Sequence, residues 1–246
     1  MTNMITFEYP LNEKMRSYLR FEFLFLQIIK SKQFTNESEI TVFFKSLFEL
    51  LELNERCDIR HDLVKDLRLL SDQMKVWLKH DEVDHQAVSS LLVEIASLTE
   101  ALLAMPKQLR YFKTNRFLSS LKQRFCIPSG SCNFDLPQYH FWLAENAEKQ
   151  RKDADVWLSP FDALQKALLL FLKIKRSQGS VSTQTAVNGF YQGAVENSCF
   201  VSVEVDISLA VYPMISGHKN RYSVRFMSAD IEHHLSKNIE FKQICC

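Results

Sequence analysis

Apolar residues recur with the period of an α-helix through the first two-thirds of the chain. The clearest stripe falls at positions i, i+3, i+4, i+7, i+8 and i+11, and consists of Ile40, Phe43, Phe44, Leu47, Phe48 and Leu51. A thicker apolar face spans 12–30, behind Pro10, and is expected to be mostly buried. Its expected inward residues are Met15, Leu19, Phe23, Leu26 and Ile29. Each pattern predicts one helix.

Two more apolar stripes, at 63–77 and 88–102, advance in steps of three and four on either side of the polar loop His80 to Asp84. Two such seams joined by a short loop predict an antiparallel helical hairpin, which Pro106 ends. Further helices are expected at about 109–125, behind Asp135 as an N-cap, and from Ser159-Pro160 onward. The sequence thus predicts about seven helices.

Beyond residue 177 the period changes from that of a helix to that of a strand. Residues 201–207 alternate apolar and polar, and so do residues 221–226, with a turn expected between them at 213–218. Residues 183–191 and 239–244 are weaker strand candidates, and residues 4–9 are a candidate strand added from the other terminus. The pattern predicts an α+β protein with a mainly helical domain at 1–178 and an antiparallel β domain at 179–246.

Composition and motifs argue against several enzyme classes. The chain has only five glycines, without the spacing of a dinucleotide-binding or P-loop motif. It also lacks the zinc-protease pattern H-E-x-x-H and the nucleophile elbow G-x-S-x-G. The acids at 81, 82 and 84 are expected to be solvated loop charges rather than a catalytic pair. The sequence therefore predicts a protein that is not an enzyme and that needs no cofactor.

Histidine and cysteine spacing does not favour a metal site. His80, His85, the pair at 233–234 and Cys245-Cys246 match no structural zinc pattern, so zinc is the weakest alternative. The six cysteines contain no C-x-x-C pair and are interpreted as reduced thiols. The N-terminus lacks the pattern of a signal peptide, and no apolar run approaches the ~20 residues that span a bilayer. We expect a cytoplasmic protein that does not bind a membrane.

Positive charge is local rather than global. The chain has 30 Lys and Arg and 29 Asp and Glu, which gives a net charge of +1. The stretches 101–134 and 207–229 nevertheless contain no acid. The first stretch holds the cations Lys107, Arg110, Lys113, Arg116, Lys122 and Arg124, and the second holds Lys219, Arg221 and Arg225. Arg221 and Arg225 share one strand face, ~13 Å apart, which suits an extended acidic peptide.

Two alternative interpretations of these cations stay open. Cations of this kind equally protect an edge strand against aggregation or form a solvated helix face. A nucleic-acid-binding module that uses residues 107–124 is the competing function, although the net charge of +1 does not favour it.

Several segments along the whole chain resemble the ZapD family of bacterial cell-division proteins. They are Phe7-Glu-Tyr-Pro-Leu-Asn-Glu-Lys-Met-Arg16, Ile127-Pro-Ser-Gly-Ser-Cys-Asn-Phe-Asp-Leu-Pro137, Asn188-Gly-Phe-Tyr-Gln192, the run 212–227 that begins Tyr-Pro-Met-Ile-Ser-Gly-His, and the closing Cys245-Cys246. Residues 34–39 and 146–155 match least and are expected to be surface segments.

This resemblance implies a function. It implies a cytoplasmic, non-enzymatic homodimer that binds the C-terminal tail of the tubulin-like GTPase FtsZ and cross-links FtsZ filaments at the mid-cell division ring. It also implies that basic residues around the β domain and the dimer centre bind that tail. The candidates in this chain are Arg221, Arg225, Lys219, His140, Arg116, Arg56 and Lys113.

Overall fold

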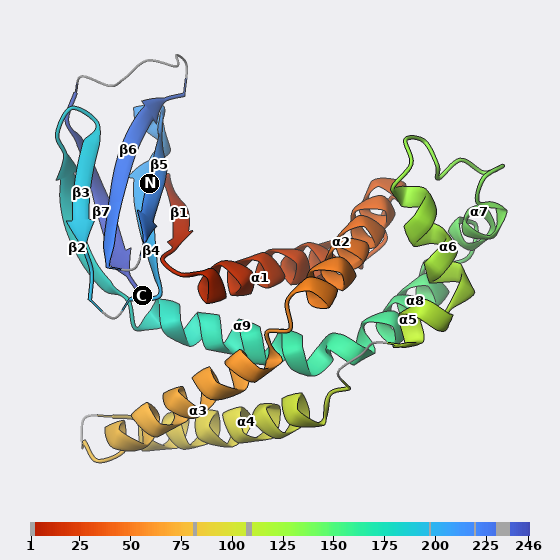
Figure 1. The fold of residues 1–246 in the computed structure, drawn as a ribbon, viewed down its shortest axis with the longest axis horizontal. Coiled ribbons are helices and arrows are strands. Elements are labelled where there is room, and N and C mark those ends of the chain that lie inside the picture. Colours follow the sequence, from red (N-terminus) through yellow and green to blue (C-terminus); the bar gives the residue numbers. More distant parts are fainter. Residues whose placement is uncertain (1–2, 81–82, 107–109, 197, 219, 230–236) are drawn as a thin grey trace. The chain divides into compact units, whose positions relative to one another are not determined.

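The computed structural model describes residues 3–80, 83–106, 110–196, 198–218, 220–229 and 237–246 (Figure 1). The chain divides into two compact units, which are considered separately. The sandwich unit comprises 1–19 and 171–246, and the helical unit comprises 20–170. The domain limits expected from the sequence, 1–178 and 179–246, stay a prediction.

The sandwich unit is built from two antiparallel sheets. The four-stranded sheet has the order β1-β4-β7-β2, with strands at Met4–Pro10, Phe200–Asp206, Ile239–Cys245 and Ser180–Ala186. The three-stranded sheet has the order β3-β6-β5, with strands at Phe190–Ala194, Arg221–Ser228 and Val211–His218. A short 3₁₀ turn, η2 (Ile207–Leu209), precedes β5. The expected strand at residues 4–9 is confirmed, because β1 pairs with β4 along its whole length.

The core of this unit lies between the sheets. Alternate residues of each strand point inward, as the period of two requires. From the four-stranded sheet come Val201, Val203, Val205, Ile239 and Phe241, and from the three-stranded sheet come Val211, Tyr222, Val224 and Phe226. The buried hydroxyl of Tyr222 donates a hydrogen bond to Gln243 Oε1 and so links the two sheets. The opposite face of the three-stranded sheet carries exposed side chains. That of the four-stranded sheet is partly covered, because Phe200 and Ser202 on it are buried and Arg176 pairs with Glu8 there.

Two strand predictions at 183–218 are wrong. The segment 183–191 is interrupted by Asn188-Gly189, whose φ angles are 51° and 71°, while Phe190 N–H donates to the Val187 carbonyl at 3.0 Å. Positive φ at both central residues makes this a type I′ hairpin turn, a geometry that Asn-Gly favours. The expected turn at 213–218 is instead most of strand β5. The strands at 200–206 and 221–228 consequently lie in different sheets.

The helices of the chain run in the following order. They are α1 (Glu13–Ser31), α2 (Glu37–Arg56), α3 (Arg60–Trp77), α4 (His85–Ala104), α5 (Arg110–Thr114), α6 (Arg116–Phe125), α7 (Pro137–Leu143), α8 (Ala147–Leu158) and, after the 3₁₀ turn η1 (Ser159–Phe161), α9 (Asp162–Ser177). The predicted hairpin is confirmed, because α3 and α4 lie side by side (Figure 1). The α+β class is confirmed as well.

A cluster of aromatic rings forms the core of the helical unit. Phe44 is fully buried at its centre. The ring centroids of seven other aromatic residues lie 5.3–6.2 Å from the ring centroid of Phe44. They are Phe43, Phe48, Phe117, Phe125, Tyr139, Trp142 and Trp157. Most of these pairs are edge-to-face or tilted, the arrangements that the ring quadrupole favours. Burial among these groups raises the pKa of Tyr139 to about 12.

Several helix predictions need correction. Helix α1 is apolar on most of its circumference, so its period does not select a face, and Phe23, Leu26 and Ile29 are exposed. Its buried side holds Tyr18, Phe21, Phe25 and Ile28. The helix expected at 109–125 is broken at Asn115, whose side chain accepts a hydrogen bond from Leu118 N–H and caps α6.

Two further corrections concern polar segments. Asp135 does not cap α7 and instead pairs with Arg124 at 3.3 Å. The stretch 146–155 lies mostly at the surface as expected, with Gln150 and Ala154 buried, and it forms most of α8, which Asn146 caps and Trp157 anchors in the core. Phe34, in the other segment expected at the surface, is buried against Phe43 and Trp142.

Candidate functional site

The outward side of the three-stranded sheet carries the two arginines that the sequence singled out. We call this surface the β6 face, and its members are Phe190, Gln192 and Ala194 of β3, Tyr212, Met214 and Ser216 of β5, and Arg221, Ser223 and Arg225 of β6. Arg221 and Arg225 are exposed, whereas Tyr222, Val224 and Phe226 between and beyond them are buried. The alternation read from the sequence therefore predicts their common face correctly.

Strand β6 is the central strand of its sheet. It pairs with β3 on one side and with β5 on the other. Cations that protect a sheet against aggregation belong on edge strands, where backbone groups are unpaired. Arg221 and Arg225 project from a strand whose two edges are already covered, so edge protection does not explain them.

The chemistry of the β6 face is cationic and free of acids in its own strands. The sequences of β3, β5 and β6 contain no Asp or Glu. Among the residues that the structure describes, none forms an ion pair with Arg221. The guanidinium carbon of Arg225 lies 5.4 Å from the ring centroid of Phe190, a cation–π distance. Lys219, the third predicted cation of this stretch, lies outside the described residues.

The remaining predicted cations belong to the helical unit. Arg116 begins α6 and His140 lies in α7, and both are exposed. Arg56, in the last turn of α2, pairs with Glu52, and Lys113 of α5 pairs with Glu55 at 3.5 Å. These four residues thus lie in a different compact unit from Arg221 and Arg225.

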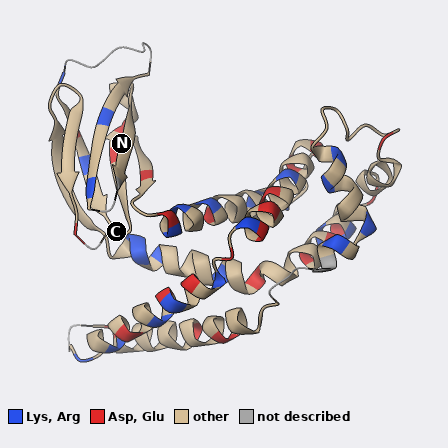
Figure 2. Cartoon of the chain, viewed as in Figure 1, with Lys and Arg blue, Asp and Glu red and all other residues tan. Residues whose placement is uncertain are grey.

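The acid-free stretch 101–134 does not form a uniformly basic surface in the described part of the chain. Lys113 and Arg124 each have an acidic partner from elsewhere in the sequence, Glu55 and Asp135. Figure 2 accordingly shows acidic and basic residues interspersed along the helices. A nucleic-acid surface needs clustered positive charge, so the alternative function gains no support from this stretch. Lys107 lies outside the described residues.

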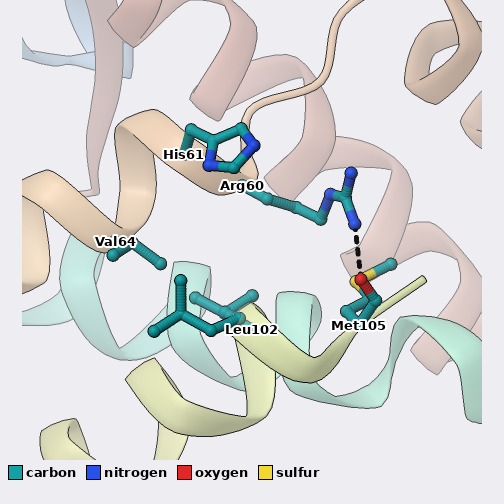
Figure 3. Close-up of a pocket in the computed structure, with 6 residues that line it drawn as sticks. Arg60, His61, Val64, Leu102 and Met105 are labelled. Carbon is teal, nitrogen blue, oxygen red and sulfur yellow. Dashed lines mark hydrogen bonds between the residues drawn. The ribbon is translucent and has the colours of Figure 1, made fainter. Parts of the chain in front are cut away.

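A cavity of about 190 Å³ lies between the start of α3 and the end of α4, and Arg60, His61, Val64, Leu102, Leu103 and Met105 line it (Figure 3). The buried Arg60 does not offer a free charge to a ligand. Its Nε and Nη2 donate to the Asp58 carboxylate at 2.8 and 2.6 Å, and its Nη1 donates to the Met105 carbonyl at 2.7 Å. These hydrogen bonds hold the pKa of Asp58 below its usual value. The arrangement joins the two ends of the helical hairpin.

Two other kinds of feature are a group of metal-ligating side chains and a helix that could span a membrane. Over the described ranges, no group of three or more His, Cys, Asp and Glu side chains is arranged to hold a metal, and residues 233–234 lie outside those ranges. One helix, α4, is long and apolar enough to cross a membrane by length and composition. This criterion alone does not assign α4 to a membrane, since it packs against α3 in the hairpin and includes Glu94 and Glu100.

Comparison with known proteins supplies the family. The model of the ZapD family, described as a cell division protein, matches residues 19–225. The chain is 40% identical over 243 residues to the cell division protein ZapD of Aliivibrio salmonicida, which covers 99% of this chain and 98% of that protein. It is 38% identical over 245 residues to the ZapD of Vibrio atlanticus, with coverage of 99% and 100%.

The chain belongs to the ZapD family. A ZapD protein of a Shewanella species is 39% identical along the full length of both chains. The resemblance detected from the sequence motifs is confirmed, and with it a role in cell division. The names of these ZapD relatives describe a division protein rather than a reaction.

Sequence reasoning missed the apolar members of the β6 face. Phe190, Tyr212 and Met214 are 41%, 39% and 58% exposed. The Asn-Gly dipeptide before Phe190 was a usable signal for a hairpin. The alternation of Tyr212 and Met214 with the buried Val211 was a second signal, which the Pro and Gly residues of this segment concealed.

Proposed function

We propose that this ZapD-family chain binds the acidic C-terminal tail of FtsZ on the β6 face and, as a homodimer, cross-links FtsZ filaments at the division ring. The observation that carries the proposal is the exposure of Arg221 and Arg225 on a central strand within a sheet that has no acidic residue. A guanidinium binds a carboxylate with two parallel hydrogen bonds. Two of them ~13 Å apart can engage two carboxylates of one extended peptide.

Dimerisation gives the interaction its strength. Each exposed ion pair contributes only ~0.2–1 kcal/mol, so one tail on one site binds weakly. A two-fold dimer presents two such sites to a filament that carries a tail on every subunit, which raises the avidity by ~10²–10⁴ without new contacts. Weak individual sites also allow the bundles to dissolve when the division ring is remodelled.

The cations of the helical unit are secondary contacts in this proposal. Arg116 and His140 are the stronger candidates because they are exposed and the described residues offer them no acidic partner. Arg56 and Lys113 must exchange the acids of α2 for those of the tail, which lowers their net contribution. The role assigned here is cytoplasmic, requires neither catalysis nor a cofactor, and involves neither a membrane nor nucleic acid.

Charge reversal at both arginines tests the proposal. The double variant Arg221→Glu/Arg225→Glu replaces attraction by repulsion, and we expect it to weaken binding of an FtsZ-tail peptide at least ~10-fold and to abolish filament bundling. Fluorescence anisotropy measures the first effect, and sedimentation of FtsZ filaments measures the second. Lys173→Glu is the matched control, since Lys173 is an exposed cation of the same unit, on α9.

Circular dichroism and light scattering should find the fold and the oligomeric state of the double variant unchanged. Undiminished bundling by a folded double variant would remove these arginines from the site. A tail peptide that fails to bind the unaltered protein would exclude this partner altogether.

Salt dependence is a second expected result. The Debye length is ~8 Å at physiological ionic strength, so exposed ion pairs weaken as salt rises. We expect the dissociation constant of the tail peptide to increase several-fold between 50 and 300 mM KCl, and the double arginine variant to lose this slope. An affinity that stays constant over this range would contradict a binding mode that depends on arginine.

A further inference from the structure

The β6 face contains an apolar group that the electrostatic proposal does not use. Phe190, Met214 and Tyr212 are all substantially exposed, although they lie on the outward side of a small sheet beside arginines. Isolated exposed apolar residues are common on protein surfaces. Three on one sheet face, around a cation, form a local arrangement that calls for a physical explanation.

The register of the strands brings these side chains together. Arg225 is directly opposite Phe190 on β3 and directly opposite Met214 on β5. Residues paired in this way have Cβ atoms ~4.5–5.5 Å apart. Tyr212 lies two residues from Met214 along β5 and therefore on the same side. Phe190, Arg225 and Met214 form one row across all three strands, and Tyr212 lies in the adjacent row, opposite Met227.

The neighbouring rows differ in character. Ser223 is opposite Gln192 and Ser216, and its hydroxyl lies 2.9 Å from that of Ser216. The row after that contains Arg221 with Ala194. The face therefore changes along the strand from apolar and cationic, through neutral polar, to cationic. Among the side chains that the structure describes in these three rows, large exposed apolar groups lie beside a cation in the row of Arg225.

We infer that the row of Phe190, Arg225 and Met214, with Tyr212, is a specificity subsite for a bulky apolar side chain next to a carboxylate in an acidic peptide. This inference rests on the proposed function and adds what the site requires of its ligand besides negative charge. The occupant that this subsite requires is a segment of the acidic tail with an aliphatic or aromatic residue next to an acid.

Two physical effects favour this occupant. The ring of Phe190, 5.4 Å from the guanidinium carbon, restricts the Arg225 side chain, so less conformational freedom is lost when the guanidinium binds a carboxylate. An apolar side chain that covers Met214 and Tyr212 then excludes water from the ion pair, and a desolvated ion pair is stronger than an exposed one. Charge complementarity comes from the absence of Asp and Glu in the three strands.

Single-stranded nucleic acid is the competing occupant, because exposed aromatic residues and arginine on a sheet also suit bases and phosphates. Arg225 lies over the ring of Phe190 and so covers part of the surface on which a base would stack. The peptide is therefore the better fit, and an oligonucleotide belongs among the test ligands.

The experiment measures binding of two labelled peptides by fluorescence anisotropy. One is the FtsZ-tail peptide, and the other keeps all its acids but has serine in place of every aliphatic and aromatic residue. The full-length protein is compared with Met214→Gln, which removes apolar character at similar size, and Met214→Leu, which restores it. Val181→Gln is the matched control, since Val181 is an exposed apolar residue of β2 in the other sheet.

We expect the unaltered protein to bind the natural tail peptide ~10-fold more tightly than the serine peptide, because one bulky side chain is buried. Met214→Gln should reduce this preference to within about threefold and leave the salt dependence in place. Met214→Leu and Val181→Gln should both retain the preference. Unchanged thermal unfolding of Met214→Gln, expected at an exposed site, excludes a folding defect.

Four results would overturn the inference. Equal binding of both peptides by the unaltered protein removes the subsite and leaves the proposed function standing. If Met214→Gln prefers the natural tail peptide over the serine peptide as strongly as the unaltered protein does, the subsite is likewise removed and the proposed function stands. Tighter binding of a labelled twelve-residue oligothymidine, lost in Met214→Gln, assigns the row to nucleic acid. Binding of neither peptide defeats the proposed function itself, and this inference with it.

Discussion

Replacement of Phe44 by alanine is expected to lower the free energy of unfolding of the helical unit by about 3–5 kcal/mol. Phe44 is fully buried and contacts the rings of seven other aromatic residues, so the truncation leaves a cavity that neighbouring rigid rings cannot fill. The loss also includes edge-to-face contacts with Tyr139 and Trp142, which add to the burial of area.

Tryptophan fluorescence measures this effect in the right part of the chain. Trp77, Trp142 and Trp157 all belong to the helical unit, and the latter two contact Phe44 directly. Urea titration followed at tryptophan emission therefore reports unfolding of this unit rather than of the sandwich unit. Phe23→Ala is the control, because Phe23 is 58% exposed on α1.

We expect Phe23→Ala to change the unfolding free energy by less than about 1 kcal/mol. Phe44→Leu should cost less than Phe44→Ala because it leaves a smaller cavity. Equal effects of the two alanine substitutions would contradict the assignment of Phe44 to the core and of Phe23 to the surface.

The comparison of these two phenylalanines indicates which parts of the fold the sequence can predict. Periodicity identified the stripe of Phe44 because polar residues occupy the other side of α2, and its members are buried. On α1 it predicted the burial of Met15 correctly but not that of Phe23, Leu26 and Ile29, because that helix is apolar on both sides. The burial of Tyr18 and Phe25 rather than Phe23 depends on contacts with distant segments, such as Tyr18 with Phe171 and Phe25 with Phe161.

The strands illustrate the same limit. Alternation within 221–226 correctly predicts the outward direction of Arg221 and Arg225, because it depends only on the local period of two. Pairing between strands is nonlocal, so the sequence did not reveal that β4 and β6 lie in different sheets. The central position of β6 and the row of Phe190, Arg225 and Met214 follow from that pairing. They are also the features that separate recognition from edge protection.

The absence of acids from a stretch of sequence did not predict a cationic surface at 101–134. That segment contains no acid, yet Lys113 pairs with Glu55, which lies on α2. In the stretch 207–229, by contrast, the strands adjacent to β6 bring no acid to it. Acid-free segments indicate a cationic surface only where the neighbours in space are also free of acids.

The buried ion pair at the helical hairpin gives the second large expected effect. Asp58→Asn should lower the free energy of unfolding of the helical unit by about 2–3 kcal/mol at pH 7, because it leaves the Arg60 guanidinium buried without its counter-charge. The value lies below the range for fully buried pairs because the Asp58 side chain is one-third exposed. Asp58→Asn/Arg60→Met removes both charges and should be less destabilised than Asp58→Asn alone.

The effect of Asp58 depends on pH in a defined direction. Hydrogen bonds from Arg60 lower the pKa of Asp58 in the folded protein below its value in the unfolded chain. The stabilisation is therefore complete above the unfolded pKa, ~4, and is lost as the pH falls through the folded pKa. Urea titrations at tryptophan emission should find a constant difference between the unaltered protein and Asp58→Asn from pH 5.5 to 8, and a shrinking difference below pH 4. A difference that stays constant down to pH 2.5 would mean that the charge of Asp58 does not stabilise the hairpin.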